Sequence, residues 1–105
     1  MDLPKVSFII PTLNSAGVLP GCLAAIRRQD YPKELIEIVI PDGGSTDATR
    51  EIAKSFGAIV IENPDRVAES GKRTALERIK GEIVVFVDSD NELTHADFVR
   101  LQWRA

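Results

Sequence analysis

Four short apolar segments recur along the chain, and segments with a helical spacing of apolar residues separate them. The apolar segments are rich in valine and isoleucine, which is typical of buried strands, and they cover residues 6–10, 36–40, 58–62 and 82–87. The helical segments lie at about residues 16–29, 47–56 and 71–79. Parallel strands need crossover connections of about this length. The pattern therefore predicts a doubly wound α/β fold with a mainly parallel sheet of about four strands.

The composition narrows the class of protein. The chain has 105 residues, 44% apolar and 28% charged, which fits one domain or part of a larger one. A formal charge of −3, with scattered lysines and arginines, argues against nucleic acid as a partner. The apolar runs are too short to cross a bilayer, no signal-peptide pattern is present, and the single cysteine, Cys22, cannot form an internal disulfide. We expect a cytoplasmic protein, with a peripheral position at the inner membrane surface as the alternative.

Polar residues follow three of the four predicted strands. They form the segments PTLN, PDGGSTD and DSDN, at residues 11–14, 41–47 and 88–91. Open α/β sheets bind ligands at the carboxyl ends of their strands, and parallel strands bring these ends to one edge. Acidic side chains from two different strands are therefore expected to converge there. A cation-dependent ligand site at this edge is the simplest interpretation.

Two carboxylates, Asp88 and Asp90, follow the last predicted strand with a single serine between them. Like charges about 5 Å apart repel by roughly 3 kcal/mol at an effective dielectric constant of about 20, so a cation is expected near them. Few, hard oxygen ligands suit Mg²⁺ or Mn²⁺ completed by substrate phosphates. A pair of solvated loop carboxylates is the alternative. An EF-hand is excluded because Leu93 stands where the turn glycine belongs.

The segment DGGSTD combines a glycine turn with the start of a helix. Ser45 or Thr46 can cap this helix, and Asp47 can stabilise its first turn. Asp42 leaves the strand before the turn begins, where a carboxylate can accept hydrogen bonds from a ribose or a base. No lysine follows the glycines as it would in a P-loop. We therefore expect the loop to serve a nucleoside.

Basic residues mark the predicted start of the third helix. Lys72 and Arg73 lie where the helix macrodipole disfavours cations, so their presence asks for a reason. One explanation is that these side chains point toward an anion held by the acidic pair, and Lys72 is the favoured candidate. The alternative is a solvated basic turn. Arg66, in an irregular loop expected at residues 63–70, is a weaker candidate of the same kind.

Taken in order, these motifs resemble those of the family 2 glycosyltransferases, the inverting GT-A enzymes that use nucleotide sugars. The resemblance runs from VSFIIPTLN through QDYP, IVIPDGGSTD and GKRTALERIKGE to VFVDSDN. It implies a Rossmann-like nucleotide-binding half in which Asp88 and Asp90 contact ribose and a divalent cation, Mg²⁺ or Mn²⁺, that bridges the diphosphate. It also implies that Pro11 and Asp42 line the nucleoside pocket of a UDP- or GDP-sugar, and that Lys72 lies where relatives often carry a basic residue.

The chain also departs from this family pattern. Many relatives have an aromatic residue in place of Leu13 and a second aspartate in place of Gly43, two positions that commonly meet the base. Such domains are usually much longer, so the resemblance implies a single, truncated donor-binding domain over residues 1–105, without the catalytic base. We expect no transfer by this polypeptide alone to the hydroxyl of a saccharide or lipid acceptor. The truncated face would be exposed or self-associated, and its apolar residues are Phe98, Leu101 and Trp103.

Two other interpretations of the same residues stay open. Phosphohydrolases of the haloacid dehalogenase type also end a strand in D-x-D, and Asp88 would then be the nucleophile and Asp90 the acid-base. Against this, Glu92 stands where that pattern prefers threonine or valine. The other alternative is a non-catalytic nucleotide-binding or interaction module.

Overall fold

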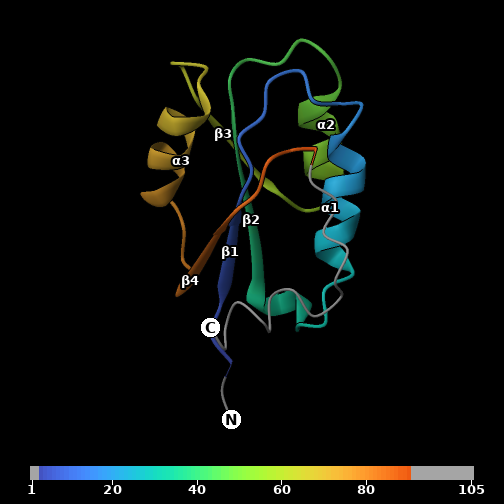
Figure 1. Ribbon diagram of the computed structural model, residues 1–105, viewed down its shortest axis with the longest axis vertical. Coiled ribbons are helices and arrows are strands. Elements are labelled where there is room, and N and C mark those ends of the chain that lie inside the picture. Colours follow the sequence, from blue (N-terminus) through green and yellow to red (C-terminus); the bar gives the residue numbers. More distant parts are fainter. Residues whose placement is uncertain (1–2, 91–105) are drawn as a thin grey trace.

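The computed structural model describes residues 3–90 and shows a parallel sheet with helices on both faces (Figure 1). The strands are β1 (Val6–Ile9), β2 (Ile36–Asp42), β3 (Ile59–Glu62) and β4 (Ile83–Phe86), in the spatial order β3-β2-β1-β4. The helices are α1 (Leu19–Arg27), α2 (Thr49–Ser55) and α3 (Ala68–Leu76), and a short 3₁₀ turn, η1 (Lys33–Leu35), precedes β2. The predicted doubly wound α/β fold is confirmed.

The strand pairing brings three carboxyl ends to one edge of the sheet. All three strand pairs are parallel. Between β1 and β2 the pairing continues beyond β1, since Thr12 N donates to Pro41 O (3.1 Å) and Gly43 N donates to Thr12 O (2.9 Å). Between β1 and β4 it continues to Val87, whose N donates to Ile9 O (3.0 Å). The segments that follow β1, β2 and β4 therefore start side by side, as the sequence predicts.

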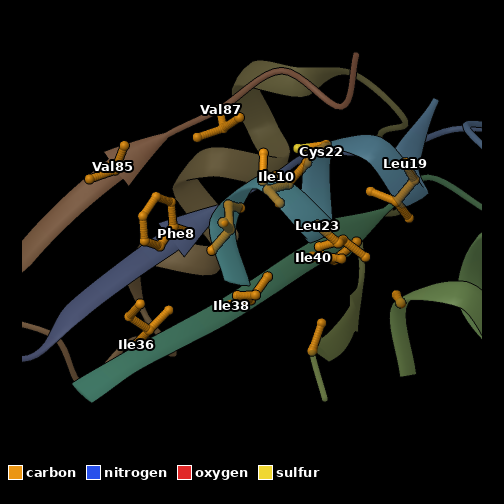
Figure 2. Close-up of a cluster of buried hydrophobic side chains, with 14 of the residues drawn as sticks. Phe8, Ile10, Leu19, Cys22, Leu23, Ile36, Ile38, Ile40, Val85 and Val87 are labelled. Atoms are coloured by element: carbon orange, nitrogen blue, oxygen red, sulfur yellow. The ribbon is translucent and has the colours of Figure 1, made fainter. Parts of the chain in front are cut away.

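The alternation of side chains along the strands divides the core into two layers. Helices α1 and α2 cover one face of the sheet and α3 covers the other (Figure 1). The larger layer lies under α1 and α2 (Figure 2), and its residues include Phe8, Ile10, Ile38 and Ile40. The smaller layer lies under α3 and contains Ile9, Val39, Ile61 and Ala75. Because β2 is buried along its whole length on both faces, its sequence is a nearly continuous apolar run.

Helix α3 corrects one expectation. It begins at Ala68, three residues before the predicted start, so the irregular loop expected at residues 63–70 is shorter than predicted. Lys72 and Arg73 lie inside the helix instead of at its N-terminus. The argument that the macrodipole disfavours these two cations is therefore wrong, and their presence needs no anionic ligand to explain it.

A buried asparagine accounts for the early start of α3. Asn63 Nδ2 donates to Val67 O (2.9 Å), and Asn63 Oδ1 accepts from Ser70 Oγ (3.0 Å). A Cβ on Gly71 would lie 2.8 Å from Asn63 Nδ2 and 3.2 Å from Pro41 Cβ. This first turn therefore depends on contacts with the end of β2, which the local sequence pattern does not reveal.

Two expectations about other surfaces concern membranes and self-association. Among residues 3–90, no helix is long and apolar enough to cross a bilayer. The apolar face predicted around Phe98, Leu101 and Trp103 lies outside the described residues. Self-association through that face stays a prediction.

A buried polar cluster fixes the entry into β4 at the opposite edge of the sheet. Ser7 Oγ donates to Glu37 Oε2 (2.6 Å), which also accepts from Lys80 N (2.9 Å), and Gly81 N donates to Ser7 Oγ (2.9 Å). Burial alone would raise the pKa of Glu37, but the hydrogen bonds from Lys80 and Ser7 outweigh it and the pKa is lowered. Since this cluster places the start of β4, it also helps to place the acidic pair that follows the strand.

We predict that Gly81→Ala destabilises the protein. A Cβ at this position would lie 2.7 Å from the backbone nitrogen of Ser7 and 3.1 Å from Lys5 O. Forcing the backbone apart should lower the free energy of unfolding by about 1–3 kcal/mol, measured by urea denaturation. The matched control is Gly17→Ala, because a Cβ there meets no atom within 4 Å. Equal stability losses in the two variants would contradict the prediction.

Candidate functional site

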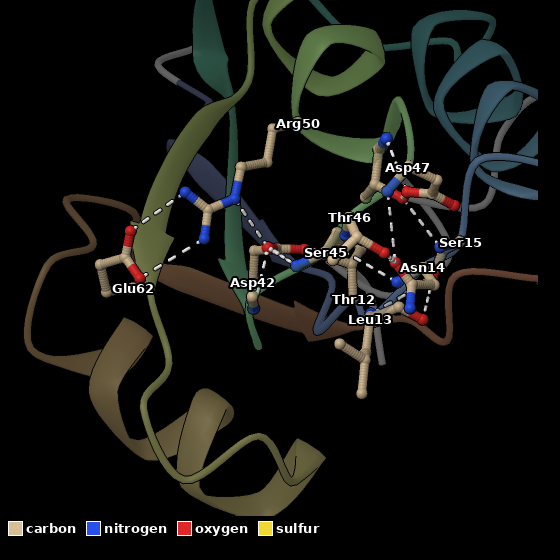
Figure 3. A network of polar contacts seen from close by, with 12 residues as sticks. Thr12, Leu13, Asn14, Ser15, Asp42, Ser45, Thr46, Asp47, Arg50 and Glu62 are labelled. Atoms are coloured by element: carbon tan, nitrogen blue, oxygen red, sulfur yellow. Dashed lines mark hydrogen bonds and ion pairs between the residues drawn. The ribbon is translucent and has the colours of Figure 1, made fainter.

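The carboxylate of Asp42 forms the polar centre of the carboxyl edge. Asp42 is the last residue of β2 and is fully buried, with 0% of its surface exposed. Within residues 3–90, five donors contact its carboxylate: Thr12 Oγ1 (2.7 Å), Ser45 Oγ (2.5 Å), Ser45 N (2.8 Å), Gly44 N (3.1 Å) and Arg50 Nε (2.8 Å). Figure 3 shows Thr12, Ser45 and Arg50 around Asp42. Arg50 also forms an ion pair with Glu62, in which Arg50 Nη1 lies 3.1 Å from Glu62 Oε1. One carboxylate thus joins the ends of β1, β2 and β3 to α2.

These contacts keep Asp42 ionised. Burial alone would raise its pKa, but hydrogen bonds from Ser45, Thr12 and Arg50 outweigh burial and hold the pKa well below its usual range. The hydrogen bonds to Asp42 and Glu62 in turn raise the pKa of Arg50. The negative charge of Asp42 is therefore balanced within the protein.

The same geometry bears on the predicted contact between Asp42 and a nucleoside. A carboxylate offers about four acceptor positions, and five protein donors already surround this one. A ribose or a base would have to displace one of them. The direct contact stays a prediction, while the described contacts show Asp42 ordering Thr12 and the loop after β2.

A second polar network joins the loop after β1 to the loop after β2 (Figure 3). Asn14 N donates to Ser45 Oγ (2.8 Å), and Asn14 Oδ1 accepts from Thr46 N (2.8 Å). Asp47 Oδ1 accepts from Thr49 N in the first turn of α2 (3.0 Å). The expectation that Ser45 or Thr46 caps α2 is wrong, because the N-cap residue is Ala48 and the hydroxyls of Ser45 and Thr46 donate to Asp42 and Asn14 instead. The expected support from Asp47 is confirmed.

A pocket of about 210 Å³ opens at this edge. Its lining comes from the segment after β1, the segment between β3 and α3, and the first residue of α3, and it consists of Pro11, Thr12, Leu13, Asn63, Arg66 and Ala68. Pro11 and Arg66, both singled out in the sequence, lie here together. Arg66 has a left-handed backbone (φ 64°), and its Cα would lie 3.1 Å from a Cβ on residue 43. Glycine at position 43 therefore permits the close approach of the loop after β2 to Arg66, which is one of the lining residues.

Asp88 and Asp90 are both exposed at the end of β4. Within residues 3–90, neither carboxylate takes part in a hydrogen bond or an ion pair, and no three potential metal ligands gather in a cluster. Two exposed carboxylates suit a hard divalent cation that takes its other ligands from water and phosphate. Asp42 does not share this role in the described structure, because its charge is paired with Arg50.

Lys72 lies in a different environment from the one expected. Its Nζ is 3.3 Å from Glu69 Oε1 and 5.4 Å from the centre of the Phe86 ring, which is within reach of a cation–π contact. These residues line a second pocket of about 420 Å³ with Arg73 and Leu76. Contact between Lys72 and a diphosphate stays a prediction.

Sequence reasoning missed three members of the site. Thr12, Arg50 and Glu62 complete the contacts of Asp42 but belong to different elements, so no local motif connects them. Asn14 offered a weak signal, since asparagine is one of the few residues that readily adopts the left-handed backbone found here (φ 50°).

Comparison with known proteins identifies the family. The pattern of Glycosyl transferase family 2 matches residues 7–102, and the chain belongs to this family. The glycosyltransferase AglE of Haloferax volcanii is 38% identical over 94 residues, which are 84% of this chain and 31% of that protein. This membership confirms the resemblance inferred from the motifs and argues against a haloacid dehalogenase-type hydrolase.

Solved structures agree with the fold. A mannosyltransferase from Pyrobaculum calidifontis, in complex with GDP-Man and Mn²⁺, superposes with a TM-score of 0.86 at 32% identity, covering 99% of this chain and 33% of that one. S. aureus TarS in complex with UDP gives a TM-score of 0.85 at 29% identity, covering 95% of this chain and 31% of that one. The chain thus spans about a third of the length of each of these three relatives.

We predict that Asp42→Asn destabilises the protein and changes its response to acid. Removing the buried charge opposite Arg50 should cost about 3–5 kcal/mol at neutral pH. Because the folded pKa of Asp42 is lowered, its contribution is present above the unfolded-state pKa of about 3.9 and is lost as the pH falls below it. Urea denaturation between about pH 7 and pH 2 should therefore show that the free energy of unfolding falls less with decreasing pH in the variant than in the wild type. The control is Asp65→Asn at an exposed position, and identical acid profiles for wild type and Asp42→Asn would contradict the prediction.

Proposed function

We propose that this chain is the donor-binding half of a glycosyltransferase, and that it binds a nucleoside diphosphate sugar together with Mg²⁺ or Mn²⁺ at the carboxyl edge of its sheet. The observation that carries this proposal is the exposed pair Asp88 and Asp90, which lacks a cationic partner within residues 3–90 and shares an edge with the pocket after β1. The reaction of the whole enzyme would be transfer of the sugar to an acceptor hydroxyl.

The pocket after β1 is assigned to the nucleoside. Its volume of about 210 Å³ is below the roughly 300–1,000 Å³ of pockets that enclose whole ligands, so it suits one part of a nucleotide sugar. Pro11 and Leu13 offer apolar contact to a base, while Asn63 and Arg66 contribute polar groups. Asp42 supports this pocket by holding Thr12 in its wall. The GDP-Man and UDP bound by the two structural neighbours support a GDP- or UDP-sugar as the ligand class.

The acidic pair is assigned to the cation and the diphosphate. A bare pair would repel a diphosphate, and a divalent cation bound there would supply the charge that stabilises the departing nucleoside diphosphate. The Mn²⁺ of the P. calidifontis mannosyltransferase supports this assignment. To reach the anion, Lys72 would have to break its ion pair with Glu69. Surface ion pairs of this kind contribute less than about 1 kcal/mol.

We predict that Asp90→Ala weakens Mn²⁺-dependent binding of UDP or GDP at least about 10-fold, because one of the two proposed cation ligands is lost. Isothermal titration calorimetry of the 105-residue chain, with and without Mn²⁺, measures this effect. Stability should change little, since the side chain is exposed. Glu51→Ala removes an equally exposed carboxylate on α2 and should bind like wild type. Unchanged nucleotide affinity in Asp90→Ala would rule out the assignment.

A further inference from the structure

The turn that carries the acidic pair, residues 88–90, lies beyond the ladder of the sheet. Val87 N makes the last backbone hydrogen bond to β1 (3.0 Å), and none is formed by residues 88–90 within the described part of the chain. Two side-chain contacts hold the turn instead. Cys22 in α1 donates its thiol, a weak donor, to the first carbonyl of the turn (3.7 Å), and Ser89 Oγ lies 3.2 Å from Ser15 Oγ.

Ser15 is a firm anchor for this turn. Its backbone N donates to Thr49 Oγ1 (2.8 Å), and its carbonyl accepts from Leu19 N at the start of α1 (2.9 Å). Thr49 is fully buried. The hydroxyl of Ser15 also accepts from the backbone N of Leu13 (3.3 Å), a residue of the pocket wall (Figure 3). Ser15 therefore connects the turn to buried Thr49, to the start of α1 and to the wall of the pocket after β1.

The three residues of the turn differ in how far their side chains are exposed. Ser89 is half-buried, whereas Asp88 and Asp90 on either side are exposed. We infer that Ser89 is a positioning residue, whose hydrogen bond to Ser15 presets the orientation of the two carboxylates toward a divalent cation. This inference rests on the proposed function, because it assigns a role within the same cation site.

The size of the effect follows from the single hydrogen bond involved. Loss of one neutral hydrogen bond changes an equilibrium by roughly 2- to 10-fold. A turn released from its anchor must be ordered when the cation binds, so the cost appears in cation affinity. We expect Ser89→Ala to weaken Mn²⁺ binding by this factor and to leave nucleotide binding without Mn²⁺ unchanged.

The test uses calorimetric titration of the 105-residue chain with MnCl₂, and with UDP and GDP in the presence and absence of Mn²⁺. Ser89→Thr keeps the hydroxyl and should restore Mn²⁺ affinity. In a chain that already carries Ser15→Ala, the additional change Ser89→Ala should cost little, because the shared hydrogen bond is already gone. The matched control is Ser55→Ala, which removes an exposed hydroxyl bonded to Ile52 O (2.7 Å) and should leave Mn²⁺ affinity unchanged.

The outcomes separate this inference from the proposed function. Wild-type Mn²⁺ affinity in Ser89→Ala, or an undiminished cost in the Ser15→Ala background, would overturn the positioning role alone. An equal loss of nucleotide affinity without Mn²⁺ would also overturn it, since that points to general damage to the site. Absence of Mn²⁺ binding by the wild-type chain would overturn the proposed cation site and the role of Ser89 with it.

Discussion

The carboxylate of Asp42 is a buried negative charge at the end of β2, and the candidate site depends on the contacts that stabilise this charge. A buried carboxylate is tolerated only with donors on its oxygens and a cation nearby. Thr12, Ser45 and Arg50 meet this need from three different segments. The requirement therefore fixes the loop after β1 against the loop after β2, and the loop after β1 carries half of the residues that line the pocket and the anchor for the acidic turn.

The acidic residues of the carboxyl edge consequently have different roles. Asp42 is neutralised inside the protein by Arg50, whereas Asp88 and Asp90 are exposed, with no cationic partner in the described residues. A charge satisfied by the fold stabilises the site, and charges left unsatisfied favour a ligand that brings a cation. This difference explains how the domain can place three carboxylates at one edge while only Asp42 is paired with a cationic side chain within residues 3–90.

The sequence predicts those features that depend on local periodicity. The strands and the exposed acidic pair follow from apolar runs and from the position of Asp88 just past one of them. The start of α3 does not, because it depends on Asn63 contacting Ser70 and the end of β2. For the same reason, the sequence predicts only part of the role of Asp42. Its place at a strand end can be read from the chain, but its pairing with Arg50 depends on how α2 packs beside β2.

The most direct test of this account is the ionisation of Asp42 itself, followed by ¹³C NMR of its side-chain carboxyl during an acid titration of the 105-residue chain. The account predicts that this carboxyl stays ionised for as long as the chain remains folded, because its donors hold the pKa well below the usual range. A titration midpoint near the ordinary value of about 3.9 in the folded protein would contradict it, since Asp42 would then not hold the loops through an ionised, fully bonded carboxylate.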